Sequence, residues 1–225
     1  TYPLGYDLPD DGSLSPQQVI LRIGQISGTD TIFTAGVGQH QMWASQFISY
    51  EHPRTWLNSG GAGTMGYGVP AAMGAKVGAP DTTVWAIDGD GCFQMTNQEL
   101  VTCALNNIPI KVAIINNESL GMVRQWQTLF YEGRYSNTSL DSKRVPDFVK
   151  LAEAYGAIGI RASKPHELDE KIKEMINVDK PVIFDCRVTK EENCFPMIPS
   201  GKAHNEMILG PDDDDVITEE GKVLV

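Results

Sequence analysis

The stretch WAIDGDGCFQMTNQELVTCALNNIPIKVAIINNESLGMVRQWQ, residues 85–127, contains two apolar runs that each end in polar turn residues. The first run ends in Gly89-Asp90-Gly91, and the second ends in Asn116-Asn117. The interval between the two turns is long enough for one helix and the next strand. Because ligands collect at the carboxyl ends of parallel strands, we expect the two turns to meet over neighbouring strands and to form a binding site.

The same alternation of strand and helix patterns continues on both sides of this stretch. Ser15-Pro16 is typical of the N-cap and first residue of a helix, which is expected to run to about Ile26. Short apolar strands separated by amphipathic helices predict an α/β fold: a parallel sheet of about six strands with helices on both faces. The strand candidates are residues 31–34, 55–57, 83–87, 111–115, 157–160 and 182–188.

Three segments are expected along the chain. Residues 1–14, rich in Pro, Gly and Asp, resemble a linker from a preceding domain, and the absence of an initiator Met at Thr1 suggests a piece of a longer protein. Residues 15–190 contain the α/β pattern. Residues 191–225, with several prolines and an acidic run, are expected to form a mobile arm or lid.

Composition excludes several classes of protein. The formal net charge of −11, with no basic run interleaved with aromatics, argues against a nucleic-acid surface, so a polyanionic ligand would need a metal ion or backbone amides. The four cysteines form no C-x-x-C pair, which favours reduced thiols in a cytosolic protein. No apolar stretch approaches the roughly 20 residues of a membrane-spanning helix.

Asp90 and Asn117 are candidate ligands of one cation. A carboxylate, a carboxamide oxygen and a backbone carbonyl are hard ligands, and two phosphate oxygens and a water would complete the octahedron of Mg²⁺. The glycines around Asp90 allow the backbone to approach a phosphate closely. An ordinary turn would explain Asp90 taken alone, but the spaced Asn pair favours the metal site.

Five motifs carry a resemblance to a known family. The sequence resembles the carboxy-terminal, diphosphate-binding domain of the acetohydroxyacid synthase (acetolactate synthase) catalytic subunit, a thiamine-diphosphate enzyme, from Tyr2 to about Pro199. The motifs are GVGQHQMW, LNSGGAGTMGYGVPAAMGA, GDGCFQMTNQEL, NNESLGMVRQWQ and RVPDFVKLAEAYG.

The resemblance implies roles for particular residues. The Mg²⁺ ligands would be Asp90, Asn117 and the backbone carbonyl of Ser119. Met65 would lie between the two cofactor rings and hold them in a V shape, with its N–H and the Gly63 carbonyl bonded to the pyrimidine. Trp126 would line the channel to the cofactor. The residues around the diphosphate would be Gln39, His40, Gly89, Gly91, Cys92, Gly121 and Met122.

The resemblance also implies an activity. Pyruvate would be decarboxylated on thiamine diphosphate and joined to a second pyruvate or to 2-oxobutyrate, the first step of branched-chain amino-acid synthesis. The Glu that activates the cofactor would belong to a pyrimidine-binding domain, and FAD to a middle domain; the sequence resembles neither, so no catalytic residue is assigned to this chain. The full subunit would be a cytoplasmic homodimer or tetramer with a small regulatory subunit.

Several alternatives stay open. Gly36-x-Gly38 resembles the start of a dinucleotide fingerprint, but Gln41 occupies the last position of that motif and no acidic residue lies near residue 58. Another thiamine-diphosphate-dependent 2-oxo-acid decarboxylase or carboligase, or a noncatalytic domain of the same fold, is the nearest alternative. Simpler interpretations of single site residues also stay open. His40 could be a merely hydrogen-bonded residue. The residues that could serve only in packing are Met65, Met122 and Trp126.

Overall fold

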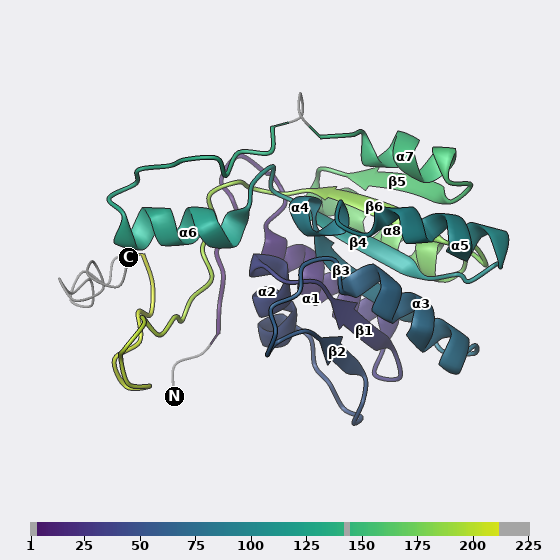
Figure 1. The fold of residues 1–225 in the computed structure, drawn as a ribbon, viewed down its shortest axis with the longest axis horizontal. Coiled ribbons are helices and arrows are strands. Elements are labelled where there is room, and N and C mark those ends of the chain that lie inside the picture. Colours follow the sequence, from purple (N-terminus) through teal and green to yellow (C-terminus); the bar gives the residue numbers. More distant parts are fainter. Residues whose placement is uncertain (1–3, 142–144, 212–225) are drawn as a thin grey trace.

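The computed structural model describes residues 4–141 and 145–211. These residues form six strands in one parallel sheet, in the order β2-β1-β3-β4-β6-β5 (Figure 1). The α/β fold with a six-stranded parallel sheet is therefore confirmed. The strands are β1 (Ile32–Ala35), β2 (Trp56–Asn58), β3 (Val84–Gly89), β4 (Lys111–Asn116), β5 (Ile158–Ala162) and β6 (Val182–Arg187).

Each expected strand is present, with ends within two residues of the expected positions. In β3 and β4 every residue is buried, as continuous apolar runs in the middle of a parallel sheet require. The helices are α1 (Pro16–Ser27), α2 (Gln39–Phe47), α3 (Gly68–Gly78), α4 (Asp90–Phe93), α5 (Leu100–Leu105), α6 (Gly121–Phe130), α7 (Phe148–Ala154) and α8 (Pro165–Ile176), with a 3₁₀ turn η1 (Asn97–Glu99).

Two hydrophobic cores lie on the two faces of the sheet. One contains the buried residues of α1, α2 and α8, and the other contains those of α3, α4, α5 and α7. The N-terminus of α1 follows the expected pattern, because Pro16 is its first residue and the Ser15 hydroxyl accepts a bond from the Gln18 N–H at 3.1 Å. Helix α6 belongs to neither face and extends beyond the carboxyl edge of the sheet (Figure 1).

The sheet order creates a crevice between β1 and β3. The chain leaves β1 into α2 on one face and leaves the neighbouring β3 into α4 on the other face. In open α/β sheets such a divergence is where ligands bind. Strand β4 lies next to β3 and leads into the start of α6, so three strand ends face one place.

Segments outside the α/β core are also held to it. Leu14, at the end of the expected linker, is buried and pairs in parallel with Val188 just after β6. In the expected arm, the Glu192 carbonyl accepts bonds from Gln39 and Arg124, and the Cys194 backbone bonds in both directions with Gln125. Residues 212–225, including the acidic run, lie outside the described residues.

Candidate functional site

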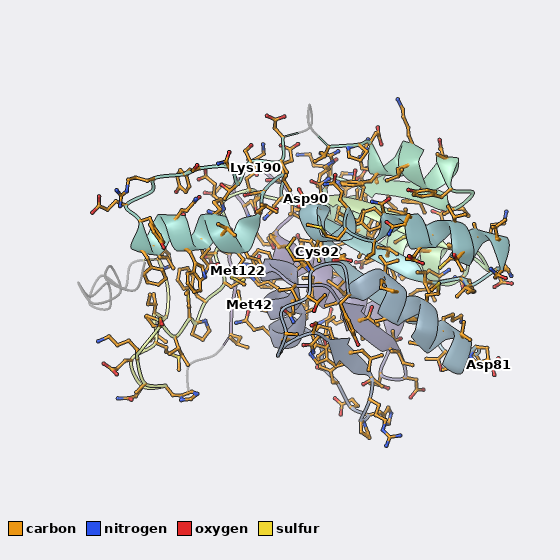
Figure 2. The ribbon with its side chains drawn as sticks, in the orientation of Figure 1. Met42, Asp81, Asp90, Cys92, Met122 and Lys190 are labelled. Atoms are coloured by element: carbon orange, nitrogen blue, oxygen red, sulfur yellow. The ribbon has the colours of Figure 1, made fainter. Side chains whose placement is uncertain are left out.

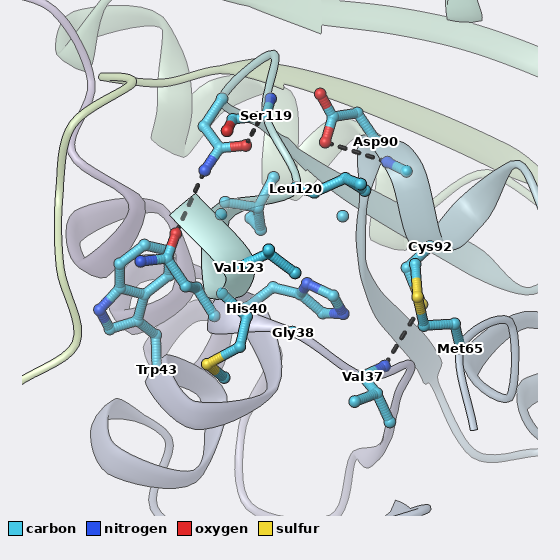
Figure 3. Close-up of a pocket in the computed structure, with 17 residues that line it drawn as sticks. Val37, Gly38, His40, Trp43, Met65, Asp90, Cys92, Ser119, Leu120 and Val123 are labelled. Atoms are coloured by element: carbon cyan, nitrogen blue, oxygen red, sulfur yellow. Dashed lines mark hydrogen bonds between the residues drawn. The ribbon is translucent and has the colours of Figure 1, made fainter. Parts of the chain in front are cut away.

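A pocket of about 100 Å³ lies where β1, β3 and β4 end (Figure 3). Its wall contains all but two of the residues expected at the cofactor. Lining residues that were expected are Gln39, His40, Met65, Gly89, Asp90, Gly91, Cys92, Asn117, Ser119, Gly121 and Met122. Lining residues that were not expected are Val37, Gly38, Trp43, Ile115, Leu120 and Val123.

The two expected metal ligands follow neighbouring strands. Asp90 comes directly after β3 and Asn117 directly after β4, and the parallel register pairs Gly89 with Ile115. Asp90 is almost fully buried; its Oδ1 accepts a bond from the Gly91 N–H at 3.0 Å, whereas its Oδ2 is buried without a partner. The Asn117 Oδ1 accepts a bond from the Ser119 N–H at 3.2 Å. The ends of β3 and β4 therefore bring a carboxylate and a carboxamide oxygen to one pocket.

The electrostatics of Asp90 call for a cation. Burial raises the pKa of Asp90 to about 7, although the bond from the Gly91 N–H opposes the effect. None of the residues that line the pocket is Lys or Arg. A divalent ion would compensate the buried charge and bind the unpaired oxygen, since buried charges in proteins are paired or coordinate metals. The residues present therefore fit a hard cation such as Mg²⁺.

Two helix N-termini also face the pocket. Gln39 and His40 begin α2, and Gly121 and Met122 begin α6. The first N–H groups of a helix have no partner within the helix and carry partial positive charge, so they attract phosphate groups. A Cβ at Gly121 would lie 2.0 Å from the Gln39 Oε1, so only glycine allows this close approach.

Gln39 connects the parts of the pocket. Its Nε2 donates to the Gln125 Oε1 at 2.8 Å and to the Glu192 carbonyl at 2.9 Å. Its Oε1 accepts a bond from the Asn117 Nδ2 at 3.3 Å. One side chain thus joins α2, α6, the loop after β4 and the segment after β6.

Sequence reasoning missed a buried cluster at the wall of the pocket, in which Asp88 lies beside the lining residues His40 and Cys92. The His40 Nε2 lies 3.5 Å from the Asp88 Oδ1, and the Cys92 Sγ accepts bonds from the Val37 and Gly66 N–H groups at 3.3 and 3.1 Å. Burial lowers the pKa of His40 to about 3 and raises the pKa of Asp88 to about 7. The signal available in the sequence was Asp88, a carboxylate within the otherwise apolar run that forms β3.

Two expected site residues lie outside the pocket wall. Gly63 has a φ of 65° in the loop before α3, and Trp126 packs edge-on against Phe130 on α6. Trp126 is 44% exposed and Met65 is 36% exposed, so neither is a buried core residue. Their roles beside a cofactor stay predictions.

Comparisons with known proteins agree with this geometry. Residues 36–186 match the family model described as "Thiamine pyrophosphate enzyme, C-terminal TPP binding domain", and thiamine pyrophosphate is thiamine diphosphate. The match covers more than half of the chain and disfavours the dinucleotide-binding alternative.

Similar curated proteins share one name. The chain is 58% identical over 210 residues to "Acetolactate synthase" of Mycobacterium bovis, covering 92% of this chain and 34% of that protein. It is 56% identical over 209 residues to the acetolactate synthase large subunit of Corynebacterium glutamicum, covering 92% and 33%. It is 46% identical over 211 residues to the mitochondrial acetolactate synthase catalytic subunit of Saccharomyces cerevisiae, covering 92% and 30%.

The chain thus spans about a third of the length of these relatives. Its fold, the pocket at the ends of β1, β3 and β4, and the match over residues 36–186 lead to the same assignment. The chain belongs to the family of C-terminal thiamine diphosphate-binding domains of thiamine diphosphate enzymes.

Proposed function

We propose that this chain is the diphosphate- and Mg²⁺-binding domain of an acetolactate synthase catalytic subunit. The proposed reaction decarboxylates pyruvate and joins the two-carbon unit to a second pyruvate or to 2-oxobutyrate. The observation that carries the proposal is the buried, unpaired Asp90 Oδ2 in a pocket that also contains Asn117 and two helix N-termini. The names of the relatives support the choice of reaction.

The chain's own residues hold the charged end of the cofactor in this proposal. Asp90, Asn117 and the Ser119 carbonyl bind Mg²⁺, and the first N–H groups of α2 and α6 bind diphosphate oxygens. Thiamine diphosphate, when bound, supplies a nucleophilic carbon and an electron sink for the decarboxylation of a 2-oxo acid. Gln39 keeps the Asn117 amide in place through its bond at 3.3 Å.

The pocket size supports a division of labour between domains. Pockets that hold whole small molecules usually enclose about 300–1,000 Å³, whereas this pocket encloses about 100 Å³. The walls of this chain therefore suit the diphosphate and the metal, and the two rings extend past Met65, whose partly exposed side chain lies at the pocket. A pyrimidine-binding domain with the activating Glu completes the site.

The wider assembly is part of the same proposal. The full subunit forms a homodimer or tetramer and associates with a small regulatory subunit. The FAD site lies mostly outside this chain, and the enzyme is cytoplasmic. In the part of the chain that the structure describes, no helix is long and apolar enough to cross a membrane.

Calorimetric titration with thiamine diphosphate, with and without Mg²⁺, tests the cofactor assignment. We expect heat of binding that requires Mg²⁺ in the native protein and is lost in Asp90→Ala, because Asn117 and one carbonyl cannot compensate the diphosphate charge. Unchanged affinity in the variant would refute the metal assignment. Product analysis with pyruvate and 2-oxobutyrate, after the pyrimidine-binding domain is supplied, separates acetolactate synthase from other decarboxylases and carboligases of the family.

A further inference from the structure

Glu118 lies between two proposed metal ligands, Asn117 and Ser119, and has an unusual backbone conformation. Its φ is 53°, in the left-handed region that side chains with a Cβ rarely occupy. A residue persists there only when surrounding contacts hold it. The contacts that hold Glu118 therefore bear on where its two neighbours point.

A closed ring of four hydrogen bonds begins and ends at Glu118. The Glu118 N–H donates to the Asn116 Oδ1 at 3.3 Å, and the Asn116 Nδ2 donates to the Asp185 Oδ1 at 2.7 Å. The Arg187 Nε donates to the Asp185 Oδ2 at 3.2 Å, and the Arg187 Nη1 donates to the Glu118 Oε1 at 3.1 Å. Hydrogen bonds thus hold Glu118 through both its backbone N–H and its side-chain carboxylate.

Further contacts fix the ring to the fold. The ammonium group of Lys190 pairs with the Glu118 Oε2, the oxygen that Arg187 leaves free. Asp185 is fully buried in β6 and also accepts a bond from the Arg161 Nε at 2.8 Å. The Glu118 carbonyl accepts a bond from the Leu140 N–H at 2.8 Å.

The partners of Glu118 come from a different part of the fold than its neighbours in the chain. Asn116 ends β4, whereas Asp185 and Arg187 belong to β6, the next strand of the sheet. The loop after β4 is therefore held by the neighbouring strand of the sheet in addition to the bonds within its own turn. We call Asn116, Glu118, Asp185, Arg187 and Lys190 the Glu118 clasp.

We propose that the Glu118 clasp sets the affinity of the pocket for the divalent metal by holding Asn117 and the Ser119 carbonyl in the ligating arrangement. Its members are positioning residues, because none of them is among the residues that line the pocket. The inference rests on the proposed function, because it assumes that the pocket binds a metal with a diphosphate.

A direct effect of charge makes the opposite prediction. Arg187 and Lys190 are cations, so through-space electrostatics alone would tighten metal binding when either charge is removed. Loss of a group that orients metal ligands instead weakens binding, typically about 10- to 100-fold. The sign of the change in Arg187→Gln therefore separates the two explanations.

The experiment measures Mn²⁺ binding to the purified protein by electron paramagnetic resonance in the presence of thiamine diphosphate. We expect Arg187→Gln and Glu118→Gln each to weaken Mn²⁺ binding by about tenfold. The double variant should bind no more weakly than the weaker single variant, because both changes open the same ring. Lys190→Gln, at a side chain that is 59% exposed, should weaken binding by a smaller factor and should not tighten it.

Asp169→Asn is the matched control. It removes one carboxylate from another arginine ion pair, Arg22–Asp169, which joins α1 to α8 away from the pocket. We expect wild-type Mn²⁺ affinity in this variant. Far-ultraviolet circular dichroism of each variant confirms that it is folded, and exposed Lys190 supplies a variant that does not depend on the core.

Each outcome has a definite meaning. Unchanged or tighter Mn²⁺ binding in Arg187→Gln, or effects of Arg187→Gln and Glu118→Gln that simply add, would overturn the clasp. Native protein that binds neither Mn²⁺ nor thiamine diphosphate would instead refute the proposed function.

Discussion

Replacing Asp90 by Asn should make the metal-free protein more stable at pH 8 while removing its response to metal and cofactor. Asn has nearly the same shape, so the change deletes a charge without leaving a cavity. In the metal-free pocket the Asp90 carboxylate is buried and its Oδ2 has no partner. The variant removes that unfavourable burial together with a proposed metal ligand.

The magnitude follows from the pKa of Asp90, which burial raises from 3.8 to about 7. Between these two values the folded state binds more protons than the unfolded state, so stability falls as the pH rises, and the cost is fully present above about pH 7. At about 1.36 kcal/mol per pKa unit the ceiling is about 4 kcal/mol. Relaxation and water entry reduce it, and a gain of about 2 kcal/mol corresponds to a melting temperature about 4–8 °C higher.

Thermal unfolding at pH 8 and pH 4, in EDTA and in Mg²⁺ with thiamine diphosphate, is the assay. In EDTA the advantage of Asp90→Asn should be large at pH 8 and small at pH 4. With cofactor at about 100 times its dissociation constant, the native protein should gain about 2.7 kcal/mol and the variant almost nothing. Asp81→Asn, at an exposed turn at the far end of α3 (Figure 2), is the control and should change neither value.

Two results would refute this reasoning. The first is an Asp90→Asn protein that is less stable than the native protein in EDTA at pH 8, which would mean that the carboxylate is favourably paired without metal. The second is an equal gain at pH 4 and pH 8, which would show that the ionisation of Asp90 has no part in the effect.

Gly121→Ala should weaken thiamine diphosphate binding by about tenfold or more in calorimetry, because the added Cβ would lie 2.0 Å from the Gln39 Oε1. The control is Gly74→Ala on α3, where an added Cβ would have no atom within 4 Å. This variant should bind normally and be more stable by about 1 kcal/mol. Normal binding in Gly121→Ala would show that the close approach is dispensable. Trp126→Leu, in the assembled enzyme, should leave cofactor affinity nearly intact and weaken binding of sulfonylurea-type inhibitors, and equal inhibition curves would remove Trp126 from the channel. The purified 225-residue chain should form no detectable acetolactate from pyruvate until a pyrimidine-binding portion is added, because acid–base assistance alone contributes about 10²- to 10⁴-fold; turnover by the chain alone would show that the activating Glu lies within it.

The sequence predicts the sheet and the meeting of Asp90 and Asn117 at one pocket well, because both depend on local patterns. The apolar runs of β3 and β4 end in turn residues, and the chain between them is long enough for one crossover, so Asp90 and Asn117 were expected to follow neighbouring strands, as they do. The ends of strands were less predictable. Ala162 and Asn58 extend β5 and β2 through pairing with adjacent strands, which a local pattern does not contain.

Contacts between distant segments were outside the reach of sequence reasoning. Glu118 is an ordinary charged residue in the sequence, and its importance comes from Asp185 and Arg187 on a strand that lies far along the chain. The cluster of His40 with Asp88 likewise forms only when α2 packs beside β3. In each case a polar side chain gains its role from the packing of segments that are distant in the sequence.

The pairing of Leu14 with Val188 has a consequence for how such a domain can be combined with others. The chain enters and leaves the α/β core side by side, at the same margin of the sheet that carries the pocket. Polypeptide attached before or after the core therefore starts from the same edge of the sheet as the pocket. Different flanking domains can therefore be joined to such a core while the loops around the pocket keep their internal geometry.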